Sequence, residues 1–473
     1  MQGPGSPVQM LGAMVGADVL SSDPADLAPF LTDHRRLFQG KALALARPRT
    51  LQQVAQILGF CNSQHIAVVP VGGNTSYCGG ATPDASGRQL LLSVARLNRI
   101  RAVDPLNYSM TAEAGCILQH VSQAAAEVDR LFPLSLGAEG SCQLGGNLAT
   151  NAGGLNVLRY GMTRDLVLGL EVVLADGRIL SNLTALRKDN TGYDLKSLFI
   201  GSEGTLGVIT AASLKLFPLP HSLSTAWAAV ANPAAAVELL SLLRDHCGDA
   251  VQSFELIPRT ALQLVTTHIA STRNPLAGDH DWQVLIELGA ANKNAPIEQQ
   301  LLDALQLGTE RGLISEAVIA NNERQRAAFW RLRETIPEAQ RQESASLKHD
   351  VSLPLTSLAE FIAIASSQVE KLAPEGFLVA YGHVGDGNLH FNVSQRRGTN
   401  LAAFLAREPI LKRAIYDLVH TRGGSFSAEH GIGQLRVGEL EHYASPVKLA
   451  LMRAIKQSLD PQGIMNPGKV LRG

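Results

Sequence analysis

The residues with the most distinctive chemistry lie in Tyr381–Val393 and in the later segment 428–433, Ala-Glu-His-Gly-Ile-Gly. His383 and His390 lie on either side of a Gly-Asp-Gly-Asn sequence, with alternating apolar residues before and after it. This pattern predicts strand, tight turn, strand, which would aim both imidazoles at one place. Two imidazoles placed in this way can share one metal ion.

A third ligand is needed, and Glu429 is the best candidate. It is a carboxylate next to a second ionisable group, His430, on a turn rich in glycine. Two histidines and one carboxylate leave coordination positions open for water or substrate, as in catalytic metal sites, and Zn²⁺ is the first choice. The alternative is that these are hydrogen-bonded structural histidines, since the chain has 13 of them.

Length and composition narrow the class of protein. A chain of 473 residues exceeds what one core usually accommodates, so two or three domains are expected. The net charge is -1 without a basic block, which argues against nucleic acid and anionic membranes as partners. The cysteines are odd in number and scattered, which favours reduced thiols that serve in packing. They are Cys61, Cys78, Cys116, Cys142 and Cys247.

The N-terminal region suggests a cytoplasmic, bacterial-type enzyme. The first basic residue is Arg35, so residues 1–34, expected to be an N-terminal extension, have neither a secretion signal nor a transit-peptide pattern. No apolar run approaches the ~20 residues of a membrane span, so no integral membrane segment is expected. Residues 1–9 are rich in Gly, Pro and Ser and are expected to be disordered or vector-derived.

A glycine-rich turn follows the first predicted strand. Apolar spacing predicts a helix over Thr50–Gln64 and a buried strand over Ile66–Val69, followed by Pro-Val-Gly-Gly-Asn-Thr-Ser at 70–76. Such a turn can present backbone N–H groups to a diphosphate, although a simple tight turn is an equal alternative. Neither a dinucleotide-binding G-x-G-x-x-G fingerprint nor a Walker sequence occurs here.

Two later segments are also rich in glycine and favour a bound cofactor. Residues 136–154 contain six glycines among hydrogen-bonding side chains, and residues 201–210, Gly-Ser-Glu-Gly-Thr-Leu-Gly-Val-Ile-Thr, precede another strand. A backbone of this composition packs poorly by itself but suits a chain wrapped around a large polar ligand.

These three loops, together with Arg187–Leu195 and Asn466–Lys469, closely resemble the FAD-linked oxidase family, whose type members are vanillyl-alcohol oxidase and p-cresol methylhydroxylase. The resemblance runs from about residue 40 to the C-terminus. With the Gly-His-Val-Gly-Asp-Gly-Asn-Leu-His and Ala-Glu-His-Gly-Ile-Gly sequences, it is greatest to the D-2-hydroxyglutarate dehydrogenase and D-lactate dehydrogenase branch.

The resemblance implies an α+β fold, with a two-subdomain FAD-binding domain of the vanillyl-alcohol oxidase type at 35–218. An inserted α/β cap at 219–422 would carry the metal hairpin, and a helical segment at 423–473 would return to the FAD domain. The cap pattern itself predicts strands near 224–230, 282–289, 314–320 and 346–353. Helices are expected near 233–246, 295–312 and 322–341, with a further helix before the hairpin, and they would cover one face of an antiparallel sheet.

The cofactor implied by the resemblance is FAD. Some members attach it covalently through a histidine in the first loop, where this chain has Asn74, so non-covalent binding is expected. The residues expected to contact FAD are Pro70, Gly72, Gly73, Asn74, Thr75, Ser76, Gly79, Gly80, Leu136, Gly137, Gly140, Ser141, Gly145, Gly146, Asn147, Thr150, Asn151, Gly153, Gly154, Glu203, Gly204, Gly207, Val208, Ile209 and Asn466.

The expected reaction oxidises a D-2-hydroxy acid to the 2-keto acid. A metal held by His383, His390 and Glu429 would chelate the substrate carboxylate and hydroxyl and lower the hydroxyl pKa. His430 would take the hydroxyl proton while the C2 hydride leaves for flavin N5. A role for His430 as a fourth metal ligand is the alternative.

Substrate recognition is assigned through the resemblance. Arg333 and Lys348 match the family's substrate-carboxylate residues, and Asn392 matches a substrate contact; the alternative for Arg333 is a solvated helix face. Position 337, a hydroxyl donor in the hydroxyglutarate enzyme, is Pro337 here, which weakens the case for recognition of a distal carboxylate.

D-2-hydroxyglutarate is therefore the first choice of substrate, with D-lactate or glycolate as alternatives. A non-catalytic flavoprotein subunit of a larger oxidase is a different class of function. Because no nicotinamide-binding fingerprint is present, electrons should pass to a protein of the electron-transfer flavoprotein type or to a quinone. A homodimer is also considered.

Overall fold

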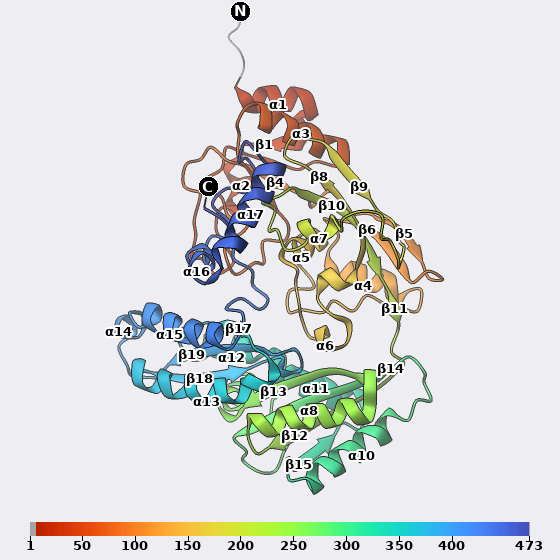
Figure 1. Cartoon of the computed structure of the whole chain (residues 1–473), viewed down its shortest axis with the longest axis vertical. Coiled ribbons are helices and arrows are strands. Elements are labelled where there is room, and N and C mark those ends of the chain that lie inside the picture. The colour runs from red at the N-terminus through yellow and green to blue at the C-terminus, as the bar shows by residue number, and fades with distance from the viewer. Residues whose placement is uncertain (1–5, 473) are drawn as a thin grey trace, which may run out of the picture. The chain divides into compact units, whose positions relative to one another are not determined.

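The structure is a computed structural model that describes residues 6–472. The chain divides into two compact units. The first comprises the described residues up to Gly154, Gly161–Leu219 and the described residues from Glu429 onward; the second comprises Leu155–Tyr160 and Pro220–Ala428 (Figure 1). The short excursion at 155–160 was not predicted, and it is held in the second unit in part because Ser253 Oγ donates to the Leu155 carbonyl (2.9 Å).

The first unit contains two principal sheets, as expected for a two-subdomain domain. The smaller has strand order β1-β2-β4-β3, in which β2 and β3 run parallel to β4. The larger is antiparallel with order β5-β6-β10-β8-β9. Their bounds are β1 Leu20–Ser21, β2 Ala44–Ala46, β3 Val68–Val71, β4 Leu90–Ser93, β5 Ile100–Asp104, β6 Ser109–Glu113, β8 Val167–Val173, β9 Ile179–Asn182 and β10 Val208–Lys215.

Helices and short strands complete this unit. Helix α3 begins after the cap residue Thr50, whose hydroxyl accepts from the N–H of Gln53 (3.2 Å), close to the predicted start. The other elements are α1 Pro7–Val15, η1 Ala17–Val19, α2 Pro24–Leu27, η2 Ala28–Phe30, α3 Leu51–Ser63, α4 Leu118–Ala126, β7 Arg130–Leu131, α5 Leu144–Thr150, η3 Thr163–Leu166, α7 Lys196–Phe199, β11 Phe217–Pro218, α16 Val437–Tyr443 and α17 Pro446–Leu459.

The expectation for residues 1–9 is wrong in part. Residues 1–5 lie outside the described part of the chain, but Pro7–Gln9 belong to α1. A capping box between Ser6 and Gln9 starts the helix, and Leu11 and Val15 are buried in a core to which α3 also contributes. These contacts explain why the Gly- and Pro-rich start does not prevent a helix.

The C-terminal segment packs into the first unit. Met465 forms a parallel bridge with Val68, and the Lys456 ammonium donates to the carbonyls of Thr205 and Met465 (2.7 Å each). All five cysteines are buried thiols outside any disulfide, and burial raises the pKa of Cys61 to about 12, in line with the predicted packing role. Within residues 6–472, no helix combines the length and apolar character that a bilayer crossing requires.

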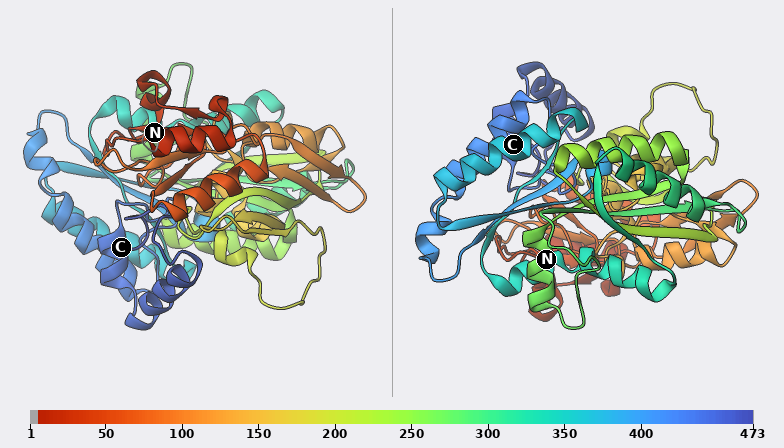
Figure 2. Two further views of the ribbon diagram at one scale, coloured as in Figure 1. Left: turned by 90° about the horizontal axis from the view of Figure 1, so that it is seen from above. Right: turned by 90° about the horizontal axis from the view of Figure 1, so that it is seen from below.

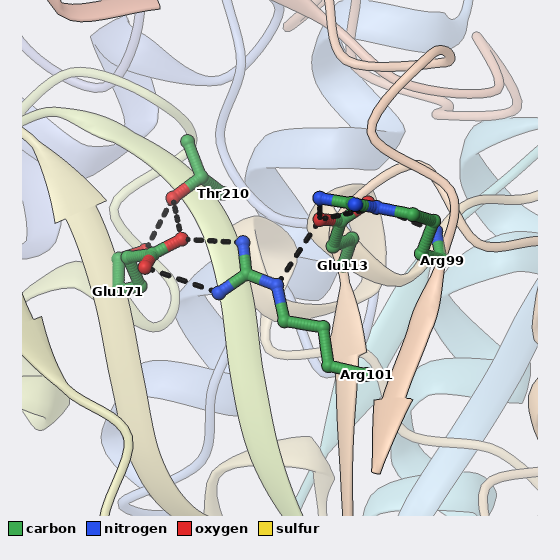
Figure 3. Close-up of polar contacts among 5 residues, drawn as sticks. All are labelled: Arg99, Arg101, Glu113, Glu171 and Thr210. Atoms are coloured by element: carbon green, nitrogen blue, oxygen red, sulfur yellow. Dashed lines mark hydrogen bonds and ion pairs between the residues drawn. The ribbon is translucent and has the colours of Figure 1, made fainter. Parts of the chain in front are cut away.

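A buried ion-pair network crosses the larger sheet (Figure 3). Arg101 makes two hydrogen bonds to the Glu171 carboxylate (3.1 and 2.9 Å) and a third to Glu113 Oε1 (3.1 Å). Thr210 Oγ1 also donates to Glu171 (2.9 Å), and Arg99 binds Glu113 from the solvent side. The two carboxylates are 1% and 4% exposed, so their charges depend on these partners.

Arg101→Met should therefore lower the free energy of unfolding by about 3 kcal/mol, because it leaves two buried carboxylates with one guanidinium fewer. Arg99→Met is the matched control: its side chain is 73% exposed, so a loss below about 1 kcal/mol is expected. Urea unfolding followed by circular dichroism measures both. Equal losses in the two variants would contradict this account of the network.

The second unit is built on an antiparallel sheet of order β13-β14-β12-β15. Predicted strands near 224–230, 282–289 and 314–320 correspond to β12 Ser222–Val230, β14 Trp282–Ala290 and β15 Ile314–Ile319. Strand β13, Val251–Pro258, and helix α9, Arg259–His268, were not predicted. The polar residues Gln252, Ser253 and Glu255 interrupt the apolar pattern of β13, yet all three are buried.

Helices cover both faces of this sheet, so the expectation of helices on one face is wrong. Trp227 and Ala229 pack in a core shared with α9, α11 and α12, while the intervening Ala226 and Ala228 are also fully buried. Helices α8, Pro233–Cys247, and α10, Ile297–Glu310, contact the same strands (Figure 1). Because side chains alternate along a strand, burial of consecutive residues requires cover on both faces.

The single helix predicted over 322–341 is two helices, α11 Glu323–Glu334 and α12 Ile336–Glu343. The break lies at Thr335, whose ψ is 1°, and Pro337 falls in the first turn of α12. Proline is tolerated there because the first N–H groups of a helix have no partner within the helix. Pro337 therefore starts a helix rather than kinking one.

A second sheet forms around β19, with β16 and β17 on one side and β18 on the other. The predicted strand 346–353 is divided into β16 Ser346–Leu347 and β17 Asp350–Ser352. Helices α13 and α15 lie side by side in both views of Figure 2. The remaining bounds are α6 Val157–Tyr160, η4 Gly248–Ala250, α13 Leu355–Leu372, β18 Gly376–Tyr381, η5 Val384–Asp386, β19 Asn388–Gln395, α14 Leu401–Leu405 and α15 Glu408–Thr421.

Candidate active site

The predicted histidine hairpin consists of β18, the short helix η5 and β19. Gly387 has φ of +84°, and a Cβ atom there would lie 2.2 Å from the Leu353 carbonyl oxygen, so only glycine fits this turn. His383 and His390 are brought together: their ring centroids are 5.5 Å apart with an interplanar angle of 76°.

Each histidine has a carboxylate beside its Nδ1 atom. His383 Nδ1 lies 2.6 Å from Glu255 Oε1 on β13, and His390 Nδ1 lies 3.9 Å from Asp350 Oδ1 on β17. A carboxylate hydrogen-bonded to Nδ1, as at His383, directs the opposite ring nitrogen, Nε2, toward a ligand, which is the usual arrangement around metal-binding histidines. The donor set of this hairpin therefore fits a divalent metal.

Arg333 lies in this cluster rather than on a solvated helix face. It is 5% exposed, its Nε donates to Glu255 Oε2 (2.6 Å), and its guanidinium lies 4.9 Å from the Tyr381 ring centroid. Burial alone would raise the pKa of Glu255, but Arg333 and His383 outweigh it and lower this pKa to about 2. Glu255 is thus held as a carboxylate.

Lys348 and Asn392 lie on the same face of the sheet as His390. The pairs Leu347–Val393 and Asp350–His390 keep one register, so Lys348 lies opposite Asn392. Residues directly opposite, and residues two apart on one strand, project from one face. The Asn392 amide donates to Gln340 Oε1 (3.1 Å), which fixes its orientation.

The chain reaches Glu429 along this same sheet. Ser425 and Ser352 exchange two backbone hydrogen bonds (2.9 and 2.8 Å), and the Ala428 N–H donates to the Asp350 carbonyl (3.3 Å). Asp350 is the register partner of His390. Glu429 follows Ala428 directly in the chain.

In the first unit, the three glycine loops lie against one another. A Cβ atom at Gly73 would lie 2.3 Å from the Ser141 carbonyl oxygen, and one at Gly204 would lie 3.0 Å from the Pro70 ring. The Asn466 amide donates to the carbonyls of Gly80 (2.9 Å) and Glu203 (2.7 Å). Segments far apart in the sequence are therefore assembled at one place, and their role as one cofactor site stays a prediction.

Glu203 and Asn74, both predicted cofactor contacts, bind other parts of the chain. The Glu203 carboxylate accepts from the N–H groups of Ile432 (2.7 Å) and Gly433 (2.8 Å), while the Asn74 amide donates to the carbonyls of Pro29 and Thr32. Glu203 thus holds the turn that begins with His430.

The two remaining predicted site residues of this unit lie beside the loops. The His430 ring packs on Tyr77, with centroids 4.6 Å apart. A Cβ atom at Gly153 would lie 2.7 Å from Glu429 Oε1, so the carboxylate lies against the second loop.

The loop region also fits a large polar cofactor. A Cβ atom at Gly137 or Gly146 would have no atom of residues 6–472 within 4 Å, so the backbone there is open to a ligand. Asn147 Oδ1 and Asn466 Oδ1 are buried and have no hydrogen-bond partner within the same residues. Buried polar atoms of this kind require a partner, which a bound cofactor would supply.

Three residues beside the histidines and Asn392 were not predicted: Glu255, Asp350 and Gln340. Each is at most 2% exposed. Asp350 lies two residues after Lys348, so its strand was predicted but its role was not. Glu255 lies 128 residues before His383, and no local pattern signals such a pairing.

Comparison with known proteins agrees with this arrangement. Residues 42–182 match the model of the FAD binding domain, and residues 219–470 match that of FAD linked oxidases, C-terminal domain. The chain belongs to the FAD-linked oxidase family and is an oxidoreductase with an FAD-binding domain.

Its curated relatives point to the expected branch. The chain is 41% identical to D-2-hydroxyglutarate dehydrogenase of Bos taurus (95% of this chain, 80% of the relative). It is 38% identical to the Arabidopsis thaliana enzyme of the same name (97% and 80%); both are named mitochondrial. It is 35% identical to D-2-hydroxyglutarate–pyruvate transhydrogenase of Saccharomyces cerevisiae (96% and 92%).

A solved structure with the same fold is that of p-cresol methylhydroxylase. The TM-score is 0.75 at 17% sequence identity, covering 98% of this chain and 96% of that one. This confirms the predicted fold of the vanillyl-alcohol oxidase type.

Proposed function

We propose that this protein oxidises D-2-hydroxyglutarate to the 2-keto acid, using FAD and a divalent metal. The observation that carries the proposal is the close pair His383 and His390, of which His390 shares a sheet face with Lys348 and Asn392. The named activity of the relatives supports it.

The metal would be held by His383, His390 and Glu429, with Zn²⁺ as first choice. Two imidazoles, one of them hydrogen-bonded to a carboxylate through Nδ1, suit Zn²⁺, and Glu429 is proposed as the third ligand. Such an ion would polarise the substrate hydroxyl and lower its pKa.

His430 is proposed to take the proton of that hydroxyl. Its ring packs on Tyr77, and the backbone of its turn is held by Glu203, so the imidazole has a fixed position. FAD, when bound, supplies the acceptor for the C2 hydride. The alternative role of His430 as a fourth metal ligand stays open to test by metal content in His430→Asn.

Lys348 and Asn392 are proposed to bind the substrate from the sheet face next to His390. Lys348 is half-buried, so its ammonium can meet a carboxylate with reduced competition from water. A role for Arg333 toward substrate stays a prediction, because its Nε is engaged by Glu255.

Substrate choice can be tested by flavin reduction at low substrate concentration. If Lys348 binds the distal carboxylate, D-2-hydroxyglutarate should react roughly 10- to 150-fold faster than D-lactate, the equivalent of a charge-assisted hydrogen bond of ~1.5–3 kcal/mol. Lys348→Met should then remove that advantage while leaving D-lactate nearly unaffected. Equal losses for both acids would instead place Lys348 at the reacting carboxylate, and no reaction with either would refute the function.

D-lactate or glycolate oxidation is the second candidate, favoured by Pro337. This residue offers no side-chain donor where a distal carboxylate would be recognised, according to the resemblance. A wild-type protein that reacts equally with D-lactate and D-2-hydroxyglutarate would support this candidate.

FAD is proposed to be bound non-covalently. The first loop, 70–76, contains no histidine, and the Asn74 amide is already hydrogen-bonded to the backbone. Heat- or acid-denatured protein should therefore release all of its flavin into the supernatant, as measured by absorbance. Yellow colour retained on the precipitated chain would contradict this prediction.

The electron acceptor is proposed to be a protein of the electron-transfer flavoprotein type or a quinone. The yeast relative is named a transhydrogenase that uses pyruvate, so a 2-keto acid is a further candidate to assay. A homodimer and a cytoplasmic location also stay predictions. Cell fractionation is the test of location, since the animal and plant relatives are named mitochondrial.

A further inference from the structure

Glu255 is neither a proposed metal ligand nor a proposed substrate contact, yet it is one of the most deeply buried charged residues of the second unit, 1% exposed. Its two carboxylate oxygens are divided between two partners. Oε1 lies 2.6 Å from His383 Nδ1, and Oε2 accepts from Arg333 Nε at 2.6 Å.

The backbone fixes the Glu255–His383 pair. Leu256 and Gly382, the residues next to each member, exchange two hydrogen bonds (2.9 and 3.1 Å) that join β13 to the hairpin. The side-chain bond therefore joins two backbones that are already paired, and little freedom has to be lost to form it.

The side chains form a closed cycle around the two histidines. Arg333 lies over the Tyr381 ring (4.9 Å), Tyr381 contacts His390 (5.0 Å), and His390 contacts His383 (5.5 Å). Glu255 completes the cycle between His383 and Arg333. A shift of Glu255 would therefore be transmitted directly to both His383 and Arg333.

The chemistry of the two groups fixes which of them donates in the hydrogen bond between His383 and Glu255. An ionised carboxylate only accepts, so the His383 nitrogen that faces it must carry the hydrogen. In the neutral imidazole this leaves the lone pair on Nε2, the atom on the other side of the ring. Arg333 holds the carboxylate from behind and balances its charge.

We propose that Glu255, held by Arg333, is a positioning residue that fixes the ring orientation and tautomer of His383 for metal binding. The inference rests on the proposed function of His383 and His390 as metal ligands. It goes further in assigning an outer partner that is distant in sequence, and in giving Arg333 a structural task at the metal site.

The chain offers a matched control. Glu287 is also a buried glutamate of the same sheet, on the neighbouring strand β14, and it also pairs with an arginine of α11, Arg326 (2.7 Å). It further accepts from Thr225 and Trp330 (2.8 Å each) and has no histidine among these partners. Glu255→Gln and Glu287→Gln thus each replace a buried glutamate that pairs with an arginine of α11. Glu255 contacts His383, whereas the partners named for Glu287 do not include this histidine.

The test is metal affinity, measured on the FAD-loaded protein by dialysis against graded chelator concentrations and metal analysis. Glu255→Gln should weaken Zn²⁺ binding by about 10- to 100-fold, while Glu287→Gln should stay within a factor of about 3 of wild type. The Co²⁺-loaded Glu255→Gln protein should also show an altered metal absorption band, unlike the control.

Unchanged affinity in Glu255→Gln would overturn the proposal while leaving the metal site intact. A wild-type protein that retains no metal would instead refute the proposed function, and this inference with it. If Glu255→Gln fails to fold, the double variant Glu255→Gln with Arg333→Met removes both charges and should still lose metal affinity.

Discussion

His390→Ala should abolish turnover while leaving FAD bound, and chelator treatment of the wild-type protein should have the same effect. The expected loss is at least about 100-fold, because loss of a ligand should exceed the effect of losing an outer-shell partner. His383→Ala and Glu429→Ala should behave in the same way. Added Zn²⁺, Mn²⁺ or Co²⁺ should restore the chelated wild type but not the variants.

The physical reason is the small number of ligands. With only two imidazoles and one carboxylate as ligands, each substitution removes one of the three protein groups that bind the metal. The open coordination positions are left for substrate. FAD retention is expected because the cofactor loops lie in the first unit, whereas both histidines lie in the second.

His280→Ala is the appropriate control. His280 is another histidine of the second unit with a carboxylate partner, Glu316, at 2.8 Å. Its loss should leave metal content and turnover within a factor of about 3 of wild type, as expected for a distant independent site. Full activity in metal-free protein would contradict the metal hypothesis.

Much of this site could be predicted from the sequence because its signals are local. The turn between His383 and His390 requires glycine at position 387, and the strands on both sides alternate. The glycine loops are also recognisable locally, since glycines concentrate where loop backbones approach one another.

The parts of the site that were not predicted depend on contacts between segments that are far apart in the sequence. Glu255 looked like an interruption in an apolar run, and only the pairing of Leu256 with Gly382 places it behind His383. Arg333 was expected to meet substrate, and its bond to Glu255 follows from the same long-range pairing. The residue pattern of one strand does not indicate which other strand it pairs with.

The prediction that helices cover only one face of the sheet was wrong for a related reason. Small residues such as Ala226 and Ala228 occur on the sheet face that α8 and α10 cover, and their short side chains give only a weak apolar pattern. This face is buried by α8 and α10, two helices that follow β12 in the chain.

The second large expected effect is the choice between enantiomers. A substrate held at C2 between one proton acceptor and one flavin face can present its hydride from only one configuration. L-2-hydroxyglutarate should therefore reduce the flavin at least about 100-fold more slowly than D-2-hydroxyglutarate, the scale expected when reacting atoms are misplaced by about 1 Å.

Anaerobic mixing of the purified single chain with each enantiomer, followed by flavin absorbance, tests the central claim most directly. We predict rapid bleaching of the flavin by D-2-hydroxyglutarate and almost none by the L-enantiomer in the same time. Equal bleaching by both enantiomers, or no bleaching by any D-2-hydroxy acid, would contradict the proposed active site and favour a non-catalytic flavoprotein subunit.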